Sequence, residues 1–209
     1  MENAILTETA YKALIEAILS IIIKSGMKGT TMDKVATSLS MSKRTLYKIF
    51  GSKEDMLEAV IKYNHQLHME ALSNIVNSSE TVIEIIYRIL QHHHRSMHNV
   101  NVEFIRDMDT YYNKLRSVYE KEYLRLNRSL QNMIARGIEQ GVLVPDINYP
   151  VVLKLLRIQI ESLKRMEEFF PPDITLEEAY RTICISFVRS IATPKGLEII
   201  QKYINSESP

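Results

Sequence analysis

The sequence is poor in the residues that mark several protein classes. Its 209 residues include one cysteine, six glycines and six prolines, and the formal net charge is +1 at pH 7. A lone cysteine excludes an internal disulfide framework, and Cys184 is too isolated to anchor a thiolate zinc site. A hydrophobic content of 45% with so little net charge argues against intrinsic disorder. The length suits one large domain or two small ones.

The N-terminal segment lacks the features of a signal peptide or a membrane span. It contains Glu2, Glu8 and Glu16. Its longest apolar run is about six residues, too short for either kind of segment. We therefore expect a soluble cytoplasmic protein without a membrane partner.

Helix-breaking residues are absent from a long central stretch. Neither glycine nor proline occurs between Gly51 and Gly137, and the first proline is Pro145. No segment alternates polar and apolar residues long enough to predict a strand. The chain is therefore predicted to be all-α. After the N-terminal region, apolar periodicity predicts helices over about 80–98, 103–115, 117–140, 149–170, 175–192 and 195–205.

Positive charge is concentrated near the N-terminus. One acidic residue, Asp33, accompanies these basic residues: Lys24, Lys28, Lys34, Lys43, Arg44, Lys48 and Lys53. The remainder after Lys53 is mildly negative. A compact basic segment on a slightly acidic body is typical of a protein that binds a polyanion. On charge alone, an ordinary solvated face explains it equally well.

Two short helices joined by a tight turn are predicted within this basic segment. Thr30 can cap the first helix, with Asp33 as its capping-box partner. Ser42 can cap the second, and Ser52 with Asp55 opens a longer helix. The inward-facing residues of the two short helices are Met32, Val35, Ala36, Leu39, Leu46, Ile49 and Phe50. The turn from Leu39 to Ser42 then completes a helix-turn-helix unit.

The second short helix carries donors on its outward face. Lys43 and Arg44 can reach guanine acceptors, and Thr45 can touch base edges. Tyr47 and Lys48 lie further along and can hold phosphates. A helical hairpin with a basic exposed side fits the same pattern, and the spacing alone does not separate the two interpretations.

Three segments resemble the TetR family of transcriptional regulators. The run Gly29–Ala36 is similar to the start of the family's DNA-reading unit. The run Ser42–Leu57 is similar to its recognition helix and to the start of its fourth helix. Far along the chain, Arg136–Asp146 resembles the family's connection into its eighth helix. Two positions depart from the pattern: Ser40 replaces the usual glycine of the turn, and Ile49 replaces a common histidine.

The resemblance implies a three-helix DNA-binding head with a helix-turn-helix in residues 1–52. Residues 53–209 would form a C-terminal helical bundle for effector binding and dimerisation. DNA contacts would fall to Thr31, Lys43, Arg44, Thr45, Tyr47, Lys48 and Lys53. We assign Lys43, Arg44 and Thr45 to bases and Thr31, Tyr47 and Lys53 to phosphates. One recognition helix covers only a few base pairs, so a homodimer on palindromic double-stranded DNA is expected.

Two C-terminal helices are apolar on more than one face, which predicts burial on more than one side. The apolar pattern alone allows either intrachain core or a dimer interface, and the resemblance favours the interface. The candidate interface residues are Leu156, Leu163, Met166, Phe170, Tyr180, Ile183, Cys184, Phe187 and Ile191.

The central helices are rich in aromatic, methionine and histidine side chains. Any one of them can be ordinary core, but the resemblance implies a cavity for a small-molecule effector here. The candidate lining residues are Tyr87, His94, Met97, Phe104, Met108, Tyr111, Tyr112 and Tyr119. The sequence does not identify the effector.

A histidine run, His92 to His94, invites a metal interpretation. Consecutive helical residues point about 100° apart, so the three cannot bind one ion. His94 with His98, or His65 with His68, has a workable spacing, but no cysteine or His-Glu-x-x-His element accompanies either pair. We predict no metal site and no cofactor.

These observations predict a ligand-responsive transcriptional regulator, specifically a repressor released from its operator by a small molecule. One alternative is a helix-turn-helix protein that binds DNA constitutively as an architectural factor. Another is a helical small-molecule enzyme. The chain has no nucleophile elbow, phosphate loop or acid-pair motif, so we predict that it is not an enzyme.

Overall fold

The structure, a computed structural model, describes residues 6–96, 103–104, 106–107 and 129–206. The chain forms two compact units. Unit 1 contains the chain up to Ala71 and the described residues of 99–113, and unit 2 contains the rest. The division falls within one helix, Lys53–Ser78. The domain boundary at residues 52 and 53 stays a prediction.

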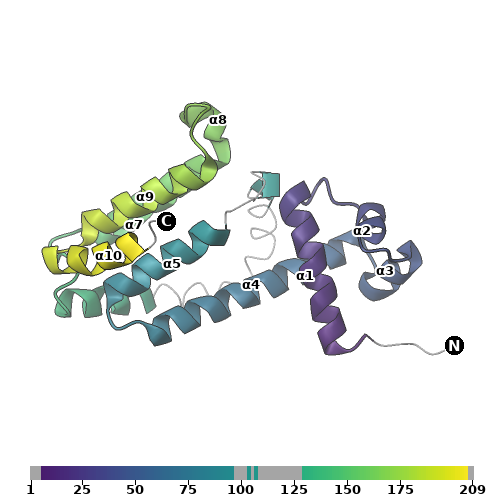
Figure 1. The fold of residues 1–209 in the computed structure, drawn as a ribbon, viewed down its shortest axis with the longest axis horizontal. Coiled ribbons are helices and arrows are strands. Elements are labelled where there is room, and N and C mark those ends of the chain that lie inside the picture. The colour runs from purple at the N-terminus through teal and green to yellow at the C-terminus, as the bar shows by residue number, and fades with distance from the viewer. Residues whose placement is uncertain (1–5, 97–102, 105, 108–128, 207–209) are drawn as a thin grey trace. The chain divides into compact units, whose positions relative to one another are not determined.

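Unit 1 begins with four helices (Figure 1). They are α1 (Glu8–Ser25), α2 (Met32–Ser38), α3 (Lys43–Phe50) and the first part of α4 (Lys53–Ser78). Their apolar stripes meet in a core of fully or nearly fully buried side chains, among them Ile18, Ile22, Val35, Leu46 and Met56. The predicted inward faces of α2 and α3 are confirmed, with Leu39 and Ile49 only half-buried.

Side-chain caps fix the starts of the short helices. Ser42 Oγ accepts a hydrogen bond from the Thr45 N–H, and Ser52 Oγ accepts one from the Asp55 N–H, as predicted. The predicted cap at Thr30 is wrong. Thr31 caps α2 by accepting from the Lys34 N–H. Thr30 is buried instead, and its hydroxyl donates to the Gly26 carbonyl, because it faces the core of the turn between α1 and α2.

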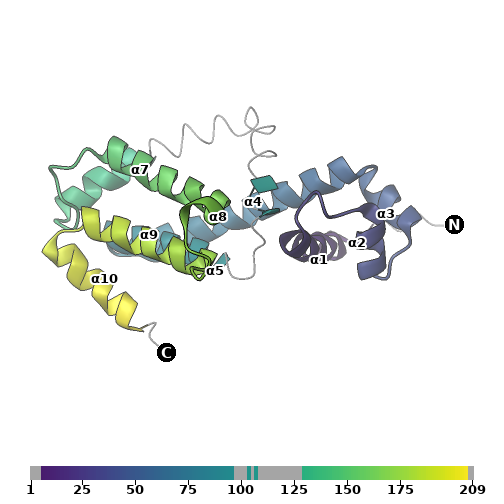
Figure 2. The ribbon, with the colours of Figure 1, turned by 90° about the horizontal axis from the view of Figure 1, so that it is seen from above.

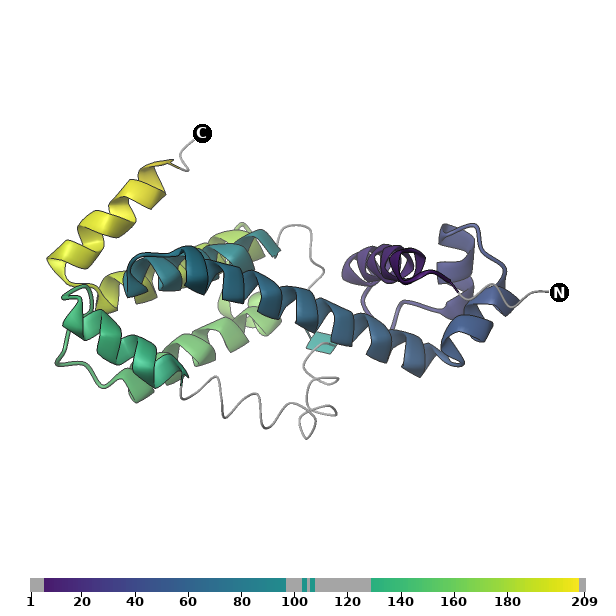
Figure 3. The ribbon, with the colours of Figure 1, turned by 90° about the horizontal axis from the view of Figure 1, so that it is seen from below.

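Unit 2 is a bundle of helices (Figures 2 and 3). It contains α5 (Val82–Ser96), a helical segment over 129–139, α7 (Tyr149–Ser162), α8 (Met166–Phe169), α9 (Leu176–Ile191) and α10 (Pro194–Ser206). Helix α9 contacts both α5 and α7, and α10 contacts α5. Within the described parts of the chain there is no strand; Leu143 and Ala192 form one isolated bridge. The predicted all-α class is confirmed.

One predicted helix, 149–170, is interrupted. A 3₁₀ turn, Leu163–Arg165, separates α7 from α8, and the backbone leaves helical geometry at Arg165 (φ −127°, ψ 49°). The tighter turn accompanies the burial of Leu163 against Ala179, Tyr180 and Cys184 of α9. Of the predicted helices 103–115 and 117–140, the structure describes helix at 103–104, 106–107 and 129–139; the remainder lies outside the described residues.

Two apolar clusters hold unit 2 together. The larger cluster joins α5, α9 and α10 and includes Val82, Tyr87, Phe187 and Ile200. The smaller one is centred on Leu163 and Tyr180. No described helix is both long and apolar enough to cross a lipid bilayer.

Candidate DNA-binding surface and effector cavity

Helix α3 presents one polar face to solvent. Lys43, Arg44, Thr45, Tyr47 and Lys48 are all exposed, while Leu46 and Phe50 are buried beneath them. The five exposed side chains therefore lie on the side that a recognition helix offers to the major groove. Arg44 and Lys48 have no hydrogen-bond or ion-pair partner among the residues the structure describes, so their charged groups are available for a ligand.

Lys43 is held by an acidic neighbour that sequence reasoning did not place in the site. Its Nζ lies 2.7 Å from Asp33 Oδ1 on α2. The hydrogen bond to Asp33 and its negative charge raise the pKa of Lys43. Asp33 is therefore a carboxylate on the otherwise basic face. Its isolation among seven cations was the signal in the sequence.

The expected phosphate contacts lie near helix starts. Thr31 is exposed at the N-terminus of α2, and its hydroxyl already accepts from the Lys34 N–H. Lys53 begins α4, and its Nζ donates to the Lys28 carbonyl oxygen at 3.4 Å. Helix N-termini present free N–H groups and the positive end of the helix dipole, which favours phosphate oxygens.

Ser40 adopts the left-handed backbone that the turn requires. Its φ is +52°, the only positive φ of a non-glycine residue in the described chain. The Met41 N–H then donates to the Ala36 carbonyl at 2.9 Å and closes the turn between α2 and α3. A non-glycine residue is strained in this conformation, so the helix-turn-helix geometry is kept at a cost.

A buried carboxylate, that of Asp107, stabilises the turn that precedes the helix-turn-helix, although Asp107 lies far from it in the sequence. Asp107 Oδ2 accepts hydrogen bonds from the Met27 N–H at 2.9 Å and the Lys28 N–H at 3.2 Å. Its other oxygen lies 3.6 Å from Lys28 Nζ. Asp107 therefore anchors the turn between α1 and α2, just before the Thr31 cap. No motif in the sequence marked this residue.

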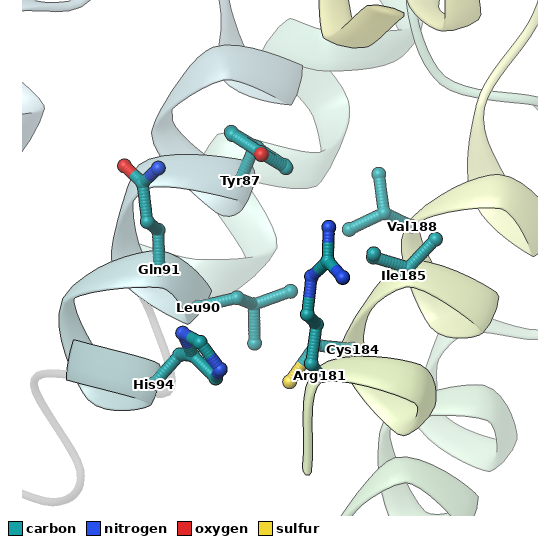
Figure 4. A pocket seen from close by; sticks show the side chains of 8 residues that line it. All are labelled: Tyr87, Leu90, Gln91, His94, Arg181, Cys184, Ile185 and Val188. Carbon is teal, nitrogen blue, oxygen red and sulfur yellow. The ribbon is translucent and has the colours of Figure 1, made fainter. Parts of the chain in front are cut away.

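A small cleft opens between α5 and α9 in unit 2 (Figure 4). Its volume is about 60 Å³. The side chains that line it are Tyr87, Leu90, Gln91, His94, Arg181, Cys184, Ile185 and Val188. The His94 ring stacks on Tyr180, with 6.4 Å between ring centroids, and its Nε2 lies 3.4 Å from Glu177 Oε1. Burial raises the pKa of the Cys184 thiol to about 11, so the thiol is neutral at neutral pH.

A second cavity of about 150 Å³ lies in unit 2. Four helical segments contribute to it: α5, 129–139, α7 and α9. Its lining is apolar and includes Ile86, Leu90, Met133, Leu153 and Phe187. The Tyr149 hydroxyl, the polar group among its lining side chains, donates to the Val144 carbonyl. Leu90 lines both this cavity and the cleft.

The predicted effector residues fall in different places. Tyr87 and His94 line the α5–α9 cleft. Phe104 belongs to unit 1, where it is half-buried. The other predicted residues, Met97, Met108, Tyr111, Tyr112 and Tyr119, lie outside the described residues. The apolar cavity was not predicted, because side chains spread over four segments have no local sequence pattern.

The predicted interface residues are largely covered by their own chain. Leu163, Tyr180, Cys184, Phe187 and Ile191 are buried. The half-buried candidates are Leu156, Met166, Phe170 and Ile183. The stripe along α7 that remains open was not among the candidates: Val151, Leu155 and Ile158 are 50%, 53% and 52% exposed. In the described part of the chain, no three His, Cys, Asp or Glu side chains are grouped to hold a metal ion.

Comparisons with known proteins agree with the helix-turn-helix geometry. Residues 14–60 match the family model of bacterial regulatory proteins, tetR family. The uncharacterized HTH-type transcriptional regulator YhgD of Bacillus subtilis is 24% identical over 166 residues, which cover 77% of this chain and 86% of YhgD. The HTH-type transcriptional repressor KstR2 of Mycobacterium tuberculosis is 21% identical over 152 residues, which cover 69% of this chain and 74% of KstR2.

Solved structures share the fold. A transcriptional regulator from Saccharomonospora viridis, in complex with choline, superposes with a TM-score of 0.70 at 18% identity, covering 90% of this chain and 100% of that one. KstR2 superposes with a TM-score of 0.63 at 17% identity, covering 90% and 98%.

A capped helix-turn-helix in unit 1 and a helical bundle in unit 2 define a DNA-binding transcriptional regulator. Residues 14–60 match the tetR-family model, and this stretch contains the helix-turn-helix whose motifs resemble that family. The two relatives YhgD and KstR2 are both named as regulators of transcription.

Proposed function

We propose that this protein is a repressor that binds a palindromic operator as a homodimer in the cytoplasm and is released by a small-molecule effector. The observation that carries the proposal is the exposed polar face of α3, with Arg44 unpaired above the buried Leu46 and Phe50. An arginine in this position can make a bidentate contact with guanine. KstR2 is named a repressor, which supports the direction of regulation.

The open stripe on α7 supports a dimer. Val151, Leu155 and Ile158 follow helical spacing and expose half of their area. Continuous exposed apolar surface marks an interaction site in soluble proteins. A second copy is the occupant we propose, since one α3 reads too few base pairs for useful affinity. The interface, predicted on residues of both 149–170 and 175–192, would then be centred on the outer face of α7.

Effector binding is supported by the cleft and the apolar cavity of unit 2. The related regulator from S. viridis was solved with choline, which supports a ligand role for this fold. For release, the effector must bind the DNA-incompetent state more tightly, with a coupling of about 1–3 kcal/mol.

Selection of bound sequences from a random DNA pool tests the proposal. Wild type, Arg44→Ala and a matched control, Arg189→Ala on the exposed face of α9, are run side by side. We expect wild type and the control to enrich one two-fold symmetric site. Arg44→Ala should bind that site more weakly by about 1–3 kcal/mol.

Enrichment of no sequence, with binding that depends only on salt, would contradict the proposal and indicate a constitutive architectural protein. An equal loss by Arg44→Ala on the selected site and on random DNA would show that Arg44 contacts phosphate.

A further inference from the structure

Three polar side chains of the cleft between α5 and α9 make no hydrogen bond to the residues that the structure describes. Gln91 and Arg181 form no hydrogen bond or ion pair with the described residues. His94 Nε2 is buried and makes no hydrogen bond, although Glu177 lies 3.4 Å away. Buried polar atoms of native proteins are normally paired, so an orphan of this kind indicates a missing partner. Figure 4 shows the Arg181 and His94 side chains in the space between the two helices.

The charge of the cleft is set by Arg181. The Cys184 thiol is neutral at neutral pH because burial raises its pKa, and apart from Arg181 and His94 the lining side chains carry hydroxyl, amide or apolar groups. The Glu177 carboxylate is a neighbour of His94 and does not line the cleft. A guanidinium with free N–H groups matches the geometry of a carboxylate, which it can bind through two parallel hydrogen bonds.

Leu90 lines both the polar cleft and the apolar cavity of about 150 Å³, so the two are neighbours in unit 2. An engineered protein cavity of about this volume holds a benzene ring. The apolar part of a ligand in this cavity is therefore an aryl ring or an alkyl chain of similar size.

We propose that the effector is a small amphipathic monocarboxylate, with its carboxylate on Arg181 and its short apolar body in the apolar cavity that Leu90 also lines. This inference rests on the proposed function, because it names the ligand class of the site in unit 2. A quaternary ammonium ligand is disfavoured, since Arg181 would repel it.

Calorimetric titration of the full chain tests the ligand class. The probes are phenylacetate and hexanoate, each compared with the corresponding alcohol, and hexadecanoate and choline. We expect the two short acids to bind at least about tenfold more tightly than their alcohols. Hexadecanoate should not fit, and choline should not bind. Equal binding of acids and alcohols, or preference for choline, would overturn the proposal.

Two variants separate the polar and apolar parts of the site. Arg181→Gln removes the charge from an exposed residue, so the fold should persist. It should weaken the acids at least about tenfold and leave the alcohols unchanged. Leu153→Trp fills the apolar cavity and should weaken acids and alcohols alike. The matched control, Arg189→Gln, lies on α9 away from both cavities and should change neither. An unchanged acid affinity in Arg181→Gln would overturn the assignment of the carboxylate.

The same acids are also titrated into the protein bound to the selected operator. This experiment tests the ligand class and the proposed function separately. Acids that bind without releasing DNA would support the ligand class and contradict effector release. Normal operator binding without any acid binding would contradict the ligand class and leave the DNA-binding proposal standing.

Discussion

Asp33 Oδ1 and Lys43 Nζ, 2.7 Å apart, pair the first helix of the helix-turn-helix with the second. Both side chains are more than half exposed, so DNA can compete for Lys43. Asp33 also places a negative charge on a face that would meet phosphates. It therefore acts against tight binding to arbitrary DNA.

Replacing Asp33 with Ala should raise affinity for non-operator DNA. The freed Lys43 can then neutralise a phosphate, and the slope of log K against log salt should steepen by about one unit. Fluorescence anisotropy on a random duplex at several salt concentrations measures this. Glu58→Ala, which removes one surface ion pair of α4, is the control and should leave the slope unchanged. An unchanged slope in Asp33→Ala would place Lys43 away from DNA.

Ser40→Gly should stabilise the protein. Glycine adopts φ near +52° without the steric cost that serine bears, and the gain should exceed the entropy that glycine adds to the unfolded chain. We expect about 0.5–1 kcal/mol more stability in urea denaturation. Ser38→Gly, at the last residue of α2, should give no such gain, because Ser38 is helical and glycine is the poorer helix former. A loss of stability in Ser40→Gly would mean that the serine side chain contributes more than the strain costs.

Asp107→Ala should destabilise unit 1 by about 1–3 kcal/mol, because the Met27 and Lys28 N–H groups lose a charged acceptor. It should also weaken operator binding, since the same turn leads into α2. Urea denaturation and anisotropy measure the two effects. Glu103→Ala is the control: this glutamate is exposed and pairs with Arg106 at the surface, so its loss should cost less than about 0.5 kcal/mol. Equal losses of stability and of operator binding in the two variants would contradict the anchoring role of Asp107.

Cys184 should react slowly with iodoacetamide in the native protein. Burial raises its pKa from 9.0 to about 11, so little thiolate exists at pH 8. The raised value favours the protonated thiol in the folded state. Its contribution to stability is fully present below about pH 9 and is lost as pH rises toward about 11. The alkylation rate as a function of pH, native and in urea, checks this; a native rate at pH 8 equal to that in urea would contradict it.

Helix periodicity and capping residues were enough to predict the helices α1 to α3 and the start of α4. The alternation of Leu46 and Phe50 with Arg44 and Lys48 already separates the buried side of α3 from its exposed side, because both follow from local spacing. The cap at Thr31 was missed by one residue, since two adjacent threonines offer the same chemistry and only packing chooses between them.

Unit 2 was less predictable because its functional features depend on long-range packing. Apolar spacing marks Tyr180 and Phe187 as buried, but it does not say whether their own chain or a second copy covers them. The apolar cavity brings together residues far apart in the sequence, as Asp107 does in unit 1. No local pattern identifies such contacts before the fold is known.

The central claim is that two copies of α3 read one symmetric operator. Sedimentation and anisotropy of wild type and Leu155→Glu, on the selected palindrome and on a duplex with one half-site scrambled, test it most directly. Leu155 is exposed, so the charge should spare the fold of the monomer while opposing burial between copies. Val76→Glu, on an exposed apolar residue of α4, is the control. We predict that wild type and the control are dimers that require both half-sites, and that Leu155→Glu is monomeric and binds both duplexes equally weakly. A monomeric wild type that binds one half-site as tightly as two would contradict the account.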